Sequence, residues 1–303
     1  MIGQRGATRS ARVIRVRPDA GTLDDAAVSR ATDGTPDAGE SATRRSERDS
    51  LAVEEPMEIR MAWSESGRRR VESVAVTMRT PGDDFELVAG FLHGEGMVRS
   101  ADDLLELTYC SGPEEQEYNV VEARLAPGLT VDVEALRRNF YTTSSCGVCG
   151  KASLDAVGAI GCQVLAPGLA IESELIAALP GRLRERQSVF ARTGGLHAAG
   201  IFQADGEARV VREDVGRHNA VDKAVGRLLL DRALPASESV LVVSGRASFE
   251  LVQKAVAAGV PVMVAVGAPS SLAVDLATRF GQTLVGFARD GGFNVYAGEE
   301  RVA

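Results

Sequence analysis

Residues 240–266 read VLVVSGRASFELVQKAVAAGVPVMVAV, and this stretch decides the fold. Two continuous apolar runs, 240–244 and 260–266, flank a segment at 249–258 with the periodicity of a helix. Strands that are apolar throughout, rather than alternately apolar and polar, are typical of a sheet covered on both faces. The stretch therefore predicts strands and helices that alternate in an α/β domain.

The same alternation continues on both sides of this stretch. The predicted elements are a hairpin of 196–203 with 209–212 across Asp205-Gly206, a helix at 215–230, a helix at 272–280 and an apolar strand at 283–287. We therefore assign residues 146–303 to one α/β domain with a mixed sheet.

Residues 51–145 predict a smaller α+β domain. Asp83 stands three residues before Glu86, a spacing typical of a capping box at the start of a helix. The other elements expected here are a hairpin of 57–63 with 74–78, strands at 105–110 and 118–125, and a short helix at 133–140.

Composition and charge exclude several classes of function. The chain of 303 residues has 34 Lys and Arg against 42 Asp and Glu, a net charge of −8. Residues 51–145 carry 9 basic and 18 acidic groups, which argues against a nucleic-acid-binding face there. No apolar run is long enough for a membrane span, and residues 1–30 lack the apolar stretch of a signal peptide, so we expect a cytoplasmic protein with free thiols.

Residues 1–50 have a different composition from the rest of the chain. They are rich in Arg, Ala, Asp, Thr, Gly and Ser and contain few large apolar side chains. Such a segment buries too little surface to offset the entropy lost on ordering. We therefore expect a disordered leader.

Two cysteines lie close together in residues 141–150, YTTSSCGVCG, which break every periodicity. The thiolate is the reactive form of cysteine, and a helix start or a cation such as Lys151 lowers its pKa. The polar approach and the paired glycines indicate an exposed loop around Cys146 and Cys149, which suits a sulfur atom that passes between partners. Cys110 and Cys162 are isolated, and small core residues are the simpler interpretation of both.

Other interpretations of the cysteine pair stay open. A structural zinc site needs four ligands, and this pair would supply only half of it. His93-Gly94-Glu95 followed by Cys146-x-x-Cys149 is similar to the zinc-deaminase pattern, but Ser145 replaces the expected Pro and the gap is long. A histidine at the end of a helix is also favourable without any metal. A CxxC oxidoreductase is a further alternative.

Other motifs could bind ligands or serve only the fold. Residues 213–223, EDVGRHNAVDK, contain Arg217, His218 and Lys223, which could bind an anion, and Asp214 would cap the following helix. An exposed helix face with local ion pairs is the interpretation that composition alone slightly favours. Residues 244–248, SGRAS, follow a strand and open a helix, where α/β proteins bind ligands. Residues 193–197, TGGLH, allow close approach of a ligand or form a turn, and residues 287–292 indicate a hairpin turn.

Taken together and in this order, four segments resemble the FdhD/NarQ family of formate dehydrogenase accessory sulfurtransferases. They are Cys146-Gly-Val-Cys149-Gly, EDVGRHNAVDK at 213–223, SGRAS at 244–248 and LVGF at 284–287. The resemblance covers about residues 51–298. It implies a homodimer with a cytidine-deaminase-like α/β domain that has lost zinc chemistry.

The resemblance also implies the reaction, its partners and its residues. Such a sulfurtransferase accepts sulfur from a cysteine desulfurase as a persulfide and passes it to molybdenum in the bis(molybdopterin guanine dinucleotide) cofactor, for formate dehydrogenase. If the residue roles of that family apply at the matching positions of this chain, Cys146 bears the persulfide and Cys149 assists. The cofactor would contact Phe287, Ala288, Arg289, Asp290, Gly291 and Gly292. A cofactor-binding chaperone that uses no thiol is the alternative.

Overall fold

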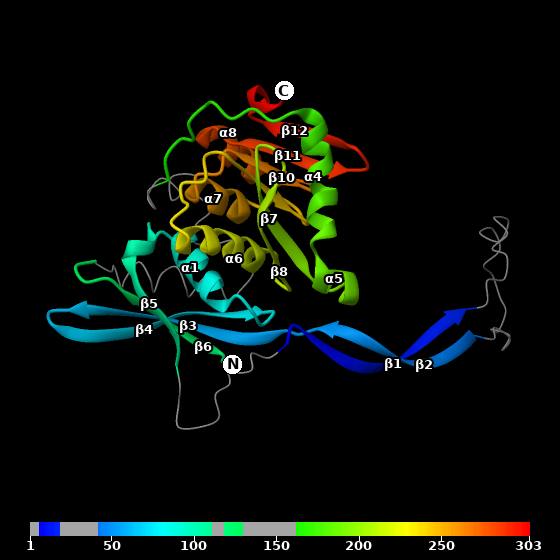
Figure 1. Cartoon of the computed structure of the whole chain (residues 1–303), viewed down its shortest axis with the longest axis horizontal. Coiled ribbons are helices and arrows are strands. Elements are labelled where there is room, and N and C mark those ends of the chain that lie inside the picture. The colour runs from blue at the N-terminus through cyan, green and yellow to red at the C-terminus, as the bar shows by residue number, and fades with distance from the viewer. Residues whose placement is uncertain (1–5, 19–41, 111–117, 130–161) are drawn as a thin grey trace, which may run out of the picture.

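The computed structural model describes residues 6–18, 42–110, 118–129 and 162–303 (Figure 1). Within these ranges the strands form three sheets, of two, four and six strands. None of the helices in these ranges combines the length and apolar character needed to cross a bilayer. The expected helix at 133–140 and both cysteines of the 146–149 pair lie outside the described residues.

The six-stranded sheet confirms the predicted mixed α/β fold. Its strand order is β12-β11-β10-β9-β7-β8, in which β9, β10 and β11 are parallel and the other pairings are antiparallel. The strands are β7 (His197–Gln203), β8 (Ala208–Asp214), β9 (Ser239–Val243), β10 (Val262–Ala265), β11 (Thr283–Arg289) and β12 (Gly292–Ala297).

Helices cover both faces of this sheet, which explains why its central strands are apolar throughout. In β9, Val240 and Val242 join a core with α4, whereas Leu241 and Val243 join a core with α6, α7 and α8 on the opposite face. Figure 1 shows α4 on one side of the sheet and α6, α7 and α8 on the other. These helices are α4 (Ser173–Glu185), α6 (Arg217–Leu230), α7 (Phe249–Ala257) and α8 (Ser271–Phe280). The short helices α5 (Ser188–Thr193) and η3 (Glu299–Arg301) complete this half, and neither they nor α4 are among the predicted elements.

The four-stranded sheet has the order β4-β3-β6-β5, and α1 packs on one face of it. Met57, Ile59 and Met61 of β3 form the core there with apolar residues of α1. The predicted hairpin is confirmed, because β3 and β4 pair antiparallel across Ser66-Gly67. The elements are β3 (Glu55–Glu65), β4 (Arg68–Arg79), α1 (Asp84–Gly94), η2 (Ala101–Asp103), β5 (Leu104–Tyr109) and β6 (Val120–Leu125).

Two glycines let α1 and α6 cross closely and join the two sheets. A Cβ added to Gly90 of α1 would lie 1.9 Å from the carbonyl oxygen of Asp222. A Cβ added to Gly226 of α6 would lie 1.8 Å from the carbonyl oxygen of Glu86. Leu229 of α6 also belongs to the core of the four-stranded sheet. The two predicted domains are therefore in direct contact through their helices.

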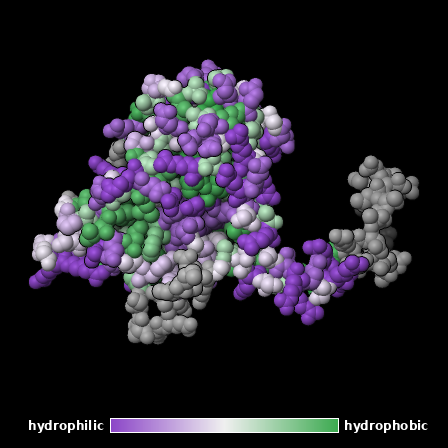
Figure 2. All heavy atoms as spheres, in the orientation of Figure 1, coloured by the Kyte–Doolittle hydropathy of each residue, from purple (hydrophilic) through white to green (hydrophobic). Residues whose placement is uncertain are grey.

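The prediction of disorder for residues 1–50 is wrong where the structure describes them. Strands β1 (Thr8–Pro18) and β2 (Ala42–Ala52) pair antiparallel in an arm that extends from the body (Figure 1). The arm buries little, since Ile14 and Val16 remain 66% and 49% exposed and most of its surface is hydrophilic (Figure 2). Backbone pairing and the Arg15–Glu47 ion pair hold it instead of a core, so composition alone does not reveal it.

Candidate functional site

The segment expected to contact the cofactor forms a hairpin, as its sequence indicates. Phe287, Ala288 and Arg289 end β11, Asp290-Gly291 is the turn, and Gly292 begins β12. Both turn residues have positive φ, 54° and 78°, the conformation of the tight turns that suit hairpins.

The hairpin presents one aromatic ring and one cation at the surface. The Phe287 side chain is 39% exposed, and the guanidinium of Arg289 lies 5.9 Å from the centre of its ring. Ala288 points the opposite way and is fully buried. Ala288 could therefore serve a ligand only through its backbone, whereas Phe287 and Arg289 could contact one directly.

Two loops and the last part of β11 meet at the carboxyl edge of the parallel strands. The N–H of Gly267, after β10, donates to the carbonyl of Gly245, after β9, at 2.9 Å. The N–H of Phe287 in β11 donates to the carbonyl of Gly267 at 3.1 Å. Gly245, Gly267 and Phe287 thus form a row across the edge where α/β sheets bind ligands. The predicted segments 244–248 and 287–292 therefore belong to one surface.

His197, Arg217 and His218 border the same edge. A Cβ added to Gly245 would lie 3.6 Å from Nδ1 of His197 and 3.9 Å from Cδ of Arg217. His218 Nε2 lies 3.4 Å from the hydroxyl of Ser248 and 3.7 Å from Oε2 of Glu250. The hydrogen bond with His218 lowers the pKa of Glu250 to about 2, so this carboxylate stays charged at neutral pH. Residues 193–197 and 213–223 thus both contribute to the edge.

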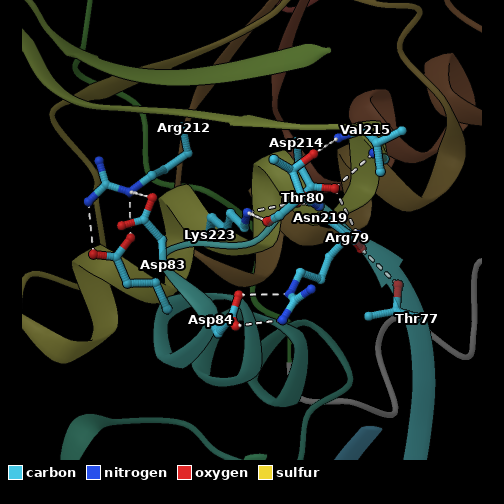
Figure 3. A network of polar contacts seen from close by, with 12 residues as sticks. Thr77, Arg79, Thr80, Asp83, Asp84, Arg212, Asp214, Val215, Asn219 and Lys223 are labelled. Atoms are coloured by element: carbon cyan, nitrogen blue, oxygen red, sulfur yellow. Dashed lines mark hydrogen bonds and ion pairs between the residues drawn. The ribbon is translucent and has the colours of Figure 1, made fainter. Parts of the chain in front are cut away.

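Lys223, by contrast, is part of the contact between the two halves of the protein (Figure 3). Its ammonium lies 2.7 Å from Oδ2 of Asp214 and donates to the carbonyl of Thr80 at 2.8 Å. Both side chains are fully buried. Lys223 is therefore neither a ligand-binding residue nor part of an exposed helix face.

Asp214 and Asn219 complete this contact. Asp214 accepts hydrogen bonds from the backbone N–H of Thr80 and from the amide of Asn219, which also donates to the carbonyl of Met78. Asp214 was predicted to cap α6, but the N-cap is Gly216, whose N–H donates to Asp214 Oδ1 at 2.8 Å. The buried residues of the 213–223 motif thus bind the end of β4. Arg217 and His218 of the same motif lie beside the carboxyl edge of the six-stranded sheet.

The predicted capping box of α1 is also wrong, although the helix is present. Asp83 is the N-cap, but its φ is 56° and its side chain makes no capping hydrogen bond. Glu86 accepts hydrogen bonds from Arg212 of β8 instead, at 2.8 Å for the Nη2–Oε1 contact. The carboxylate expected to close a local box therefore links the four-stranded sheet unit to β8.

The deaminase alternative loses its histidine ligand. His93 is buried at the end of α1, and its ring nitrogens lie 3.1 Å from the carbonyl oxygens of Val98 and Ala257. Burial lowers the pKa of His93. A neutral imidazole has one N–H and donates to one of these two carbonyls, while the other nitrogen is covered by backbone, so His93 is a packing residue between α1 and α7. Among the described residues, no group of three His, Cys, Asp or Glu side chains is placed to hold a metal ion.

The isolated cysteines fit a structural role. Cys162 is half-buried against the core of the six-stranded sheet, and burial raises the pKa of its thiol to about 11. A thiol with that pKa is almost entirely protonated at neutral pH and is a poor nucleophile. Cys110 is also partly buried, directly after β5. Cys146 and Cys149 lie outside the described residues.

Sequence reasoning missed two contributors to the edge. Gly267 lies in residues 266–270, VGAPS, which follow β10 just as SGRAS follows β9. Glu250 lies in the first turn of α7, beside His218. The position of a Gly-containing segment directly after an apolar strand was the available signal for Gly267.

The fold and the motif-bearing edge define an α/β protein, and sequence comparison gives its family. A sequence model of the FdhD/NarQ family matches residues 52–303. The chain therefore belongs to the FdhD/NarQ family. The arm precedes the matched region.

Relatives with assigned names span most of the chain. Sulfur carrier protein FdhD of Streptomyces avermitilis is 57% identical over 260 residues, which cover 84% of this chain and 89% of the relative. The protein of the same name from Nocardia farcinica is 52% identical, and the match covers 84% of this chain and 88% of the relative. The one from Sulfurisphaera tokodaii is 44% identical, and the match covers 86% of this chain and 94% of the relative.

A solved structure shares the fold. It is the crystal structure of a Desulfotalea psychrophila protein that is assigned as a formate dehydrogenase accessory protein. The TM-score is 0.69 at 22% identity, over 98% of this chain and 100% of the other. At this identity the likeness supports the fold alone.

Proposed function

We propose that this protein is a sulfurtransferase that carries sulfur, as a persulfide on Cys146, to the molybdenum of the bis(molybdopterin guanine dinucleotide) cofactor. A cysteine desulfurase would donate the sulfur, formate dehydrogenase would receive the cofactor, and a homodimer would be the working assembly. Membership of a family whose relatives are named sulfur carrier proteins supports the sulfur role. The observation that carries the cofactor role is the edge at which Gly245, Gly267 and Phe287 meet.

The residues suit both halves of this reaction. In the first half, the Cys146 thiolate attacks the outer sulfur of the donor persulfide. A new S–S bond forms on Cys146, the S–S bond of the donor breaks, and the donor cysteine leaves as a thiolate. In the second half, the Cys149 thiolate would attack the inner sulfur of the Cys146 persulfide, so that a Cys146–Cys149 disulfide forms, the persulfide S–S bond breaks and the outer sulfur leaves as sulfide for the molybdenum to bind. Cys149, three residues away, is the second thiol available to assist.

The hairpin suits a guanine nucleotide. An aromatic ring offers a flat apolar face on which a base can stack, and the exposed face of Phe287 is of this kind. Arg289 lies beside the ring and is placed to add a charged hydrogen-bond donor.

Sulfur loading tests the proposal. After incubation with a cysteine desulfurase and cysteine, mass spectrometry of the full chain and its peptides should show one added sulfur atom on Cys146. Cys146→Ala should abolish this addition. Cys162 should stay unmodified, because burial raises the pKa of its thiol to about 11.

Two controls make the result decisive. Cys162→Ala should load sulfur like the unaltered chain. If Cys146 stays unmodified while the protein binds guanine nucleotide, the cofactor-binding chaperone replaces the sulfurtransferase. Formate dehydrogenase activity in cells that carry only the Cys146→Ala form would lead to the same conclusion.

Arg289→Ala should weaken the binding of guanosine diphosphate about fivefold. An exposed arginine contributes roughly 1 kcal/mol through one charged hydrogen bond, because water competes for it. Isothermal titration calorimetry on the full chain measures the change. Unchanged affinity would remove Arg289 from the site.

A further inference from the structure

The arm formed by β1 and β2 has one face that is both basic and apolar. Residues that stand opposite each other in a ribbon share a face, and side chains alternate between the two faces along each strand. Within the described strands both carboxylates of the arm, Glu47 and Asp49, lie on one face. The opposite face, here called the basic face, carries toward the tip of the arm Arg12, Ile14, Val16, Arg44, Ser46 and Arg48.

The side chains of the basic face are exposed. Ile14 and Val16 are among the most exposed large apolar residues of the described chain, and the three arginines beside them are exposed as well. The arm contacts the body at its base, where a Cβ added to Gly195 would lie 3.5 Å from Cβ of Ala52. A two-stranded ribbon is only marginally stable in water by itself. The basic face therefore suits a surface that a partner covers.

The base of the arm has the complementary chemistry. A notch of about 490 Å³ lies there, where β2 leads into β3. Its walls include the apolar residues 51–53 and the carboxylates of Glu54 and Glu55, and Arg9 is the one basic residue among them. The chain that follows is acidic too, since residues 51–145 carry 18 acidic against 9 basic groups. Apolar and basic side chains at the tip thus match apolar and acidic ones at the base.

An arm cannot bring its own tip to its own base. Val16 and Thr8 are eight positions apart in one extended strand, which separates them by roughly 26 Å. The arm also extends away from the body (Figure 1). Two copies related by a twofold axis satisfy both ends at once, because antiparallel arms place the tip of each at the base of the other. Arms that met tip to tip would instead bring arginines onto arginines.

We propose that two copies of this chain exchange contacts through their arms, with the basic face of each on the notch of the other. Ile14 and Val16 would pack against residues 51–53, and Arg44 and Arg48 would lie beside Glu54. The exchange deepens the proposed function, which rests on a homodimer, by naming a contact between its two copies. The argument for the contact itself depends only on the residues of the arm and its base.

A charge swap tests the exchange. Sedimentation equilibrium of the full chain gives the dissociation constant of the dimer. Arg44→Glu combined with Arg48→Glu should raise this constant about tenfold, because reversal turns attraction into repulsion at two symmetry-related places. Glu54→Arg should act in the same direction. An equimolar mixture of the two variants should restore association, since each copy then meets its opposite charge. Glu55 is left unaltered because it also contacts Arg79.

Arg45→Glu is the matched control. It makes the same change of charge at the neighbouring position, but Arg45 stands opposite Arg15 on the other face of the arm. The dissociation constant should therefore stay unchanged. Equal constants for the Arg44→Glu, Arg48→Glu variant and the unaltered chain would overturn the exchange, as would a mixture that does not associate.

A photo-crosslinking amino acid in place of Ile14 maps the contact directly. On illumination it should join residues 51–55, and such a link must connect two copies because the base of the same arm lies roughly 20 Å away. A link to residues 19–41, which carry six acidic and one basic group, would give the basic face to its own chain and overturn the exchange. A monomer that floats with phosphatidylglycerol vesicles would give it to a lipid surface and also overturn the exchange.

The two proposals fail separately. If the cross-link to residues 51–55 is absent while Cys146 takes up sulfur, the exchange is wrong and the sulfurtransferase stands. If the cross-link forms while Cys146 stays unmodified, the exchange stands and the sulfurtransferase is wrong.

Discussion

Lys223→Ala should lower the free energy of unfolding by about 3–5 kcal/mol, the usual cost of removing one partner of a buried ion pair. The ammonium of Lys223 lies 2.7 Å from Asp214, and both side chains are buried. Without Lys223, Asp214 keeps a buried charge that its remaining donors only partly satisfy. The carbonyl of Thr80 also loses its donor.

Urea denaturation followed by circular dichroism measures this loss. The double variant Lys223→Met with Asp214→Asn should lose less than the sum of the two single changes, because neither residue then leaves a charge behind. Arg232→Ala is the control: it removes the Arg232–Asp102 pair, which is largely exposed and screened by solvent, and should cost far less than Lys223→Ala. A loss that small for Lys223→Ala would mean that the buried pair does not hold the two halves together.

Gly226→Ala should destabilise the protein by about 3 kcal/mol, at the upper end of the usual cost of overpacking. The added methyl group would lie 1.8 Å from the carbonyl oxygen of Glu86, so α1 and α6 must move apart. A side chain could relieve such a clash by changing its rotamer, but a backbone carbonyl cannot. The same displacement would also disturb the packing of Leu229 in the core of the four-stranded sheet.

Gly181→Ala supplies the matched control for that change. Gly181 also lies inside a helix, α4, but a Cβ there would meet nothing within 4 Å. Alanine is the better helix former, so this variant should gain about 0.5–1 kcal/mol. Opposite signs for the two substitutions, measured by urea denaturation, would confirm that crowding decides the cost at Gly226. Equal effects would contradict it.

The local patterns in the sequence were sufficient to locate most elements. Apolar runs predicted β9, β10 and β11, and helical periodicity predicted α1, α6, α7 and α8 close to their observed bounds. Helix α4 carries buried Ile176, Leu179 and Leu183 at helical spacing, but Pro180 in its interior obscures the pattern. The arm could not be predicted, because its pairing joins residues more than twenty positions apart and buries little apolar surface.

The candidate site was also predictable only in part, because some of its contacts join residues that are far apart in the sequence. The segments 244–248 and 287–292 could be singled out because each adjoins an apolar strand. The sequence did not predict which charged residues of the 213–223 motif reach the carboxyl edge of the six-stranded sheet. Arg217 and Lys223 are both basic and differ in the side of α6 on which they lie. Asp214 and Lys223 pair directly, and each also bonds the backbone of Thr80, which is more than 130 positions earlier in the chain.

The close crossing of α1 and α6 also bears on the order in which the chain folds. The four-stranded sheet and α1 are complete by residue 125, whereas α6 spans Arg217–Leu230. During synthesis about ninety further residues must therefore be made after β6 before α6, the helix that packs against Gly90, begins. Contacts of such long range slow folding and leave apolar surface exposed meanwhile. The half made first thus depends, for its final packing, on the half made last.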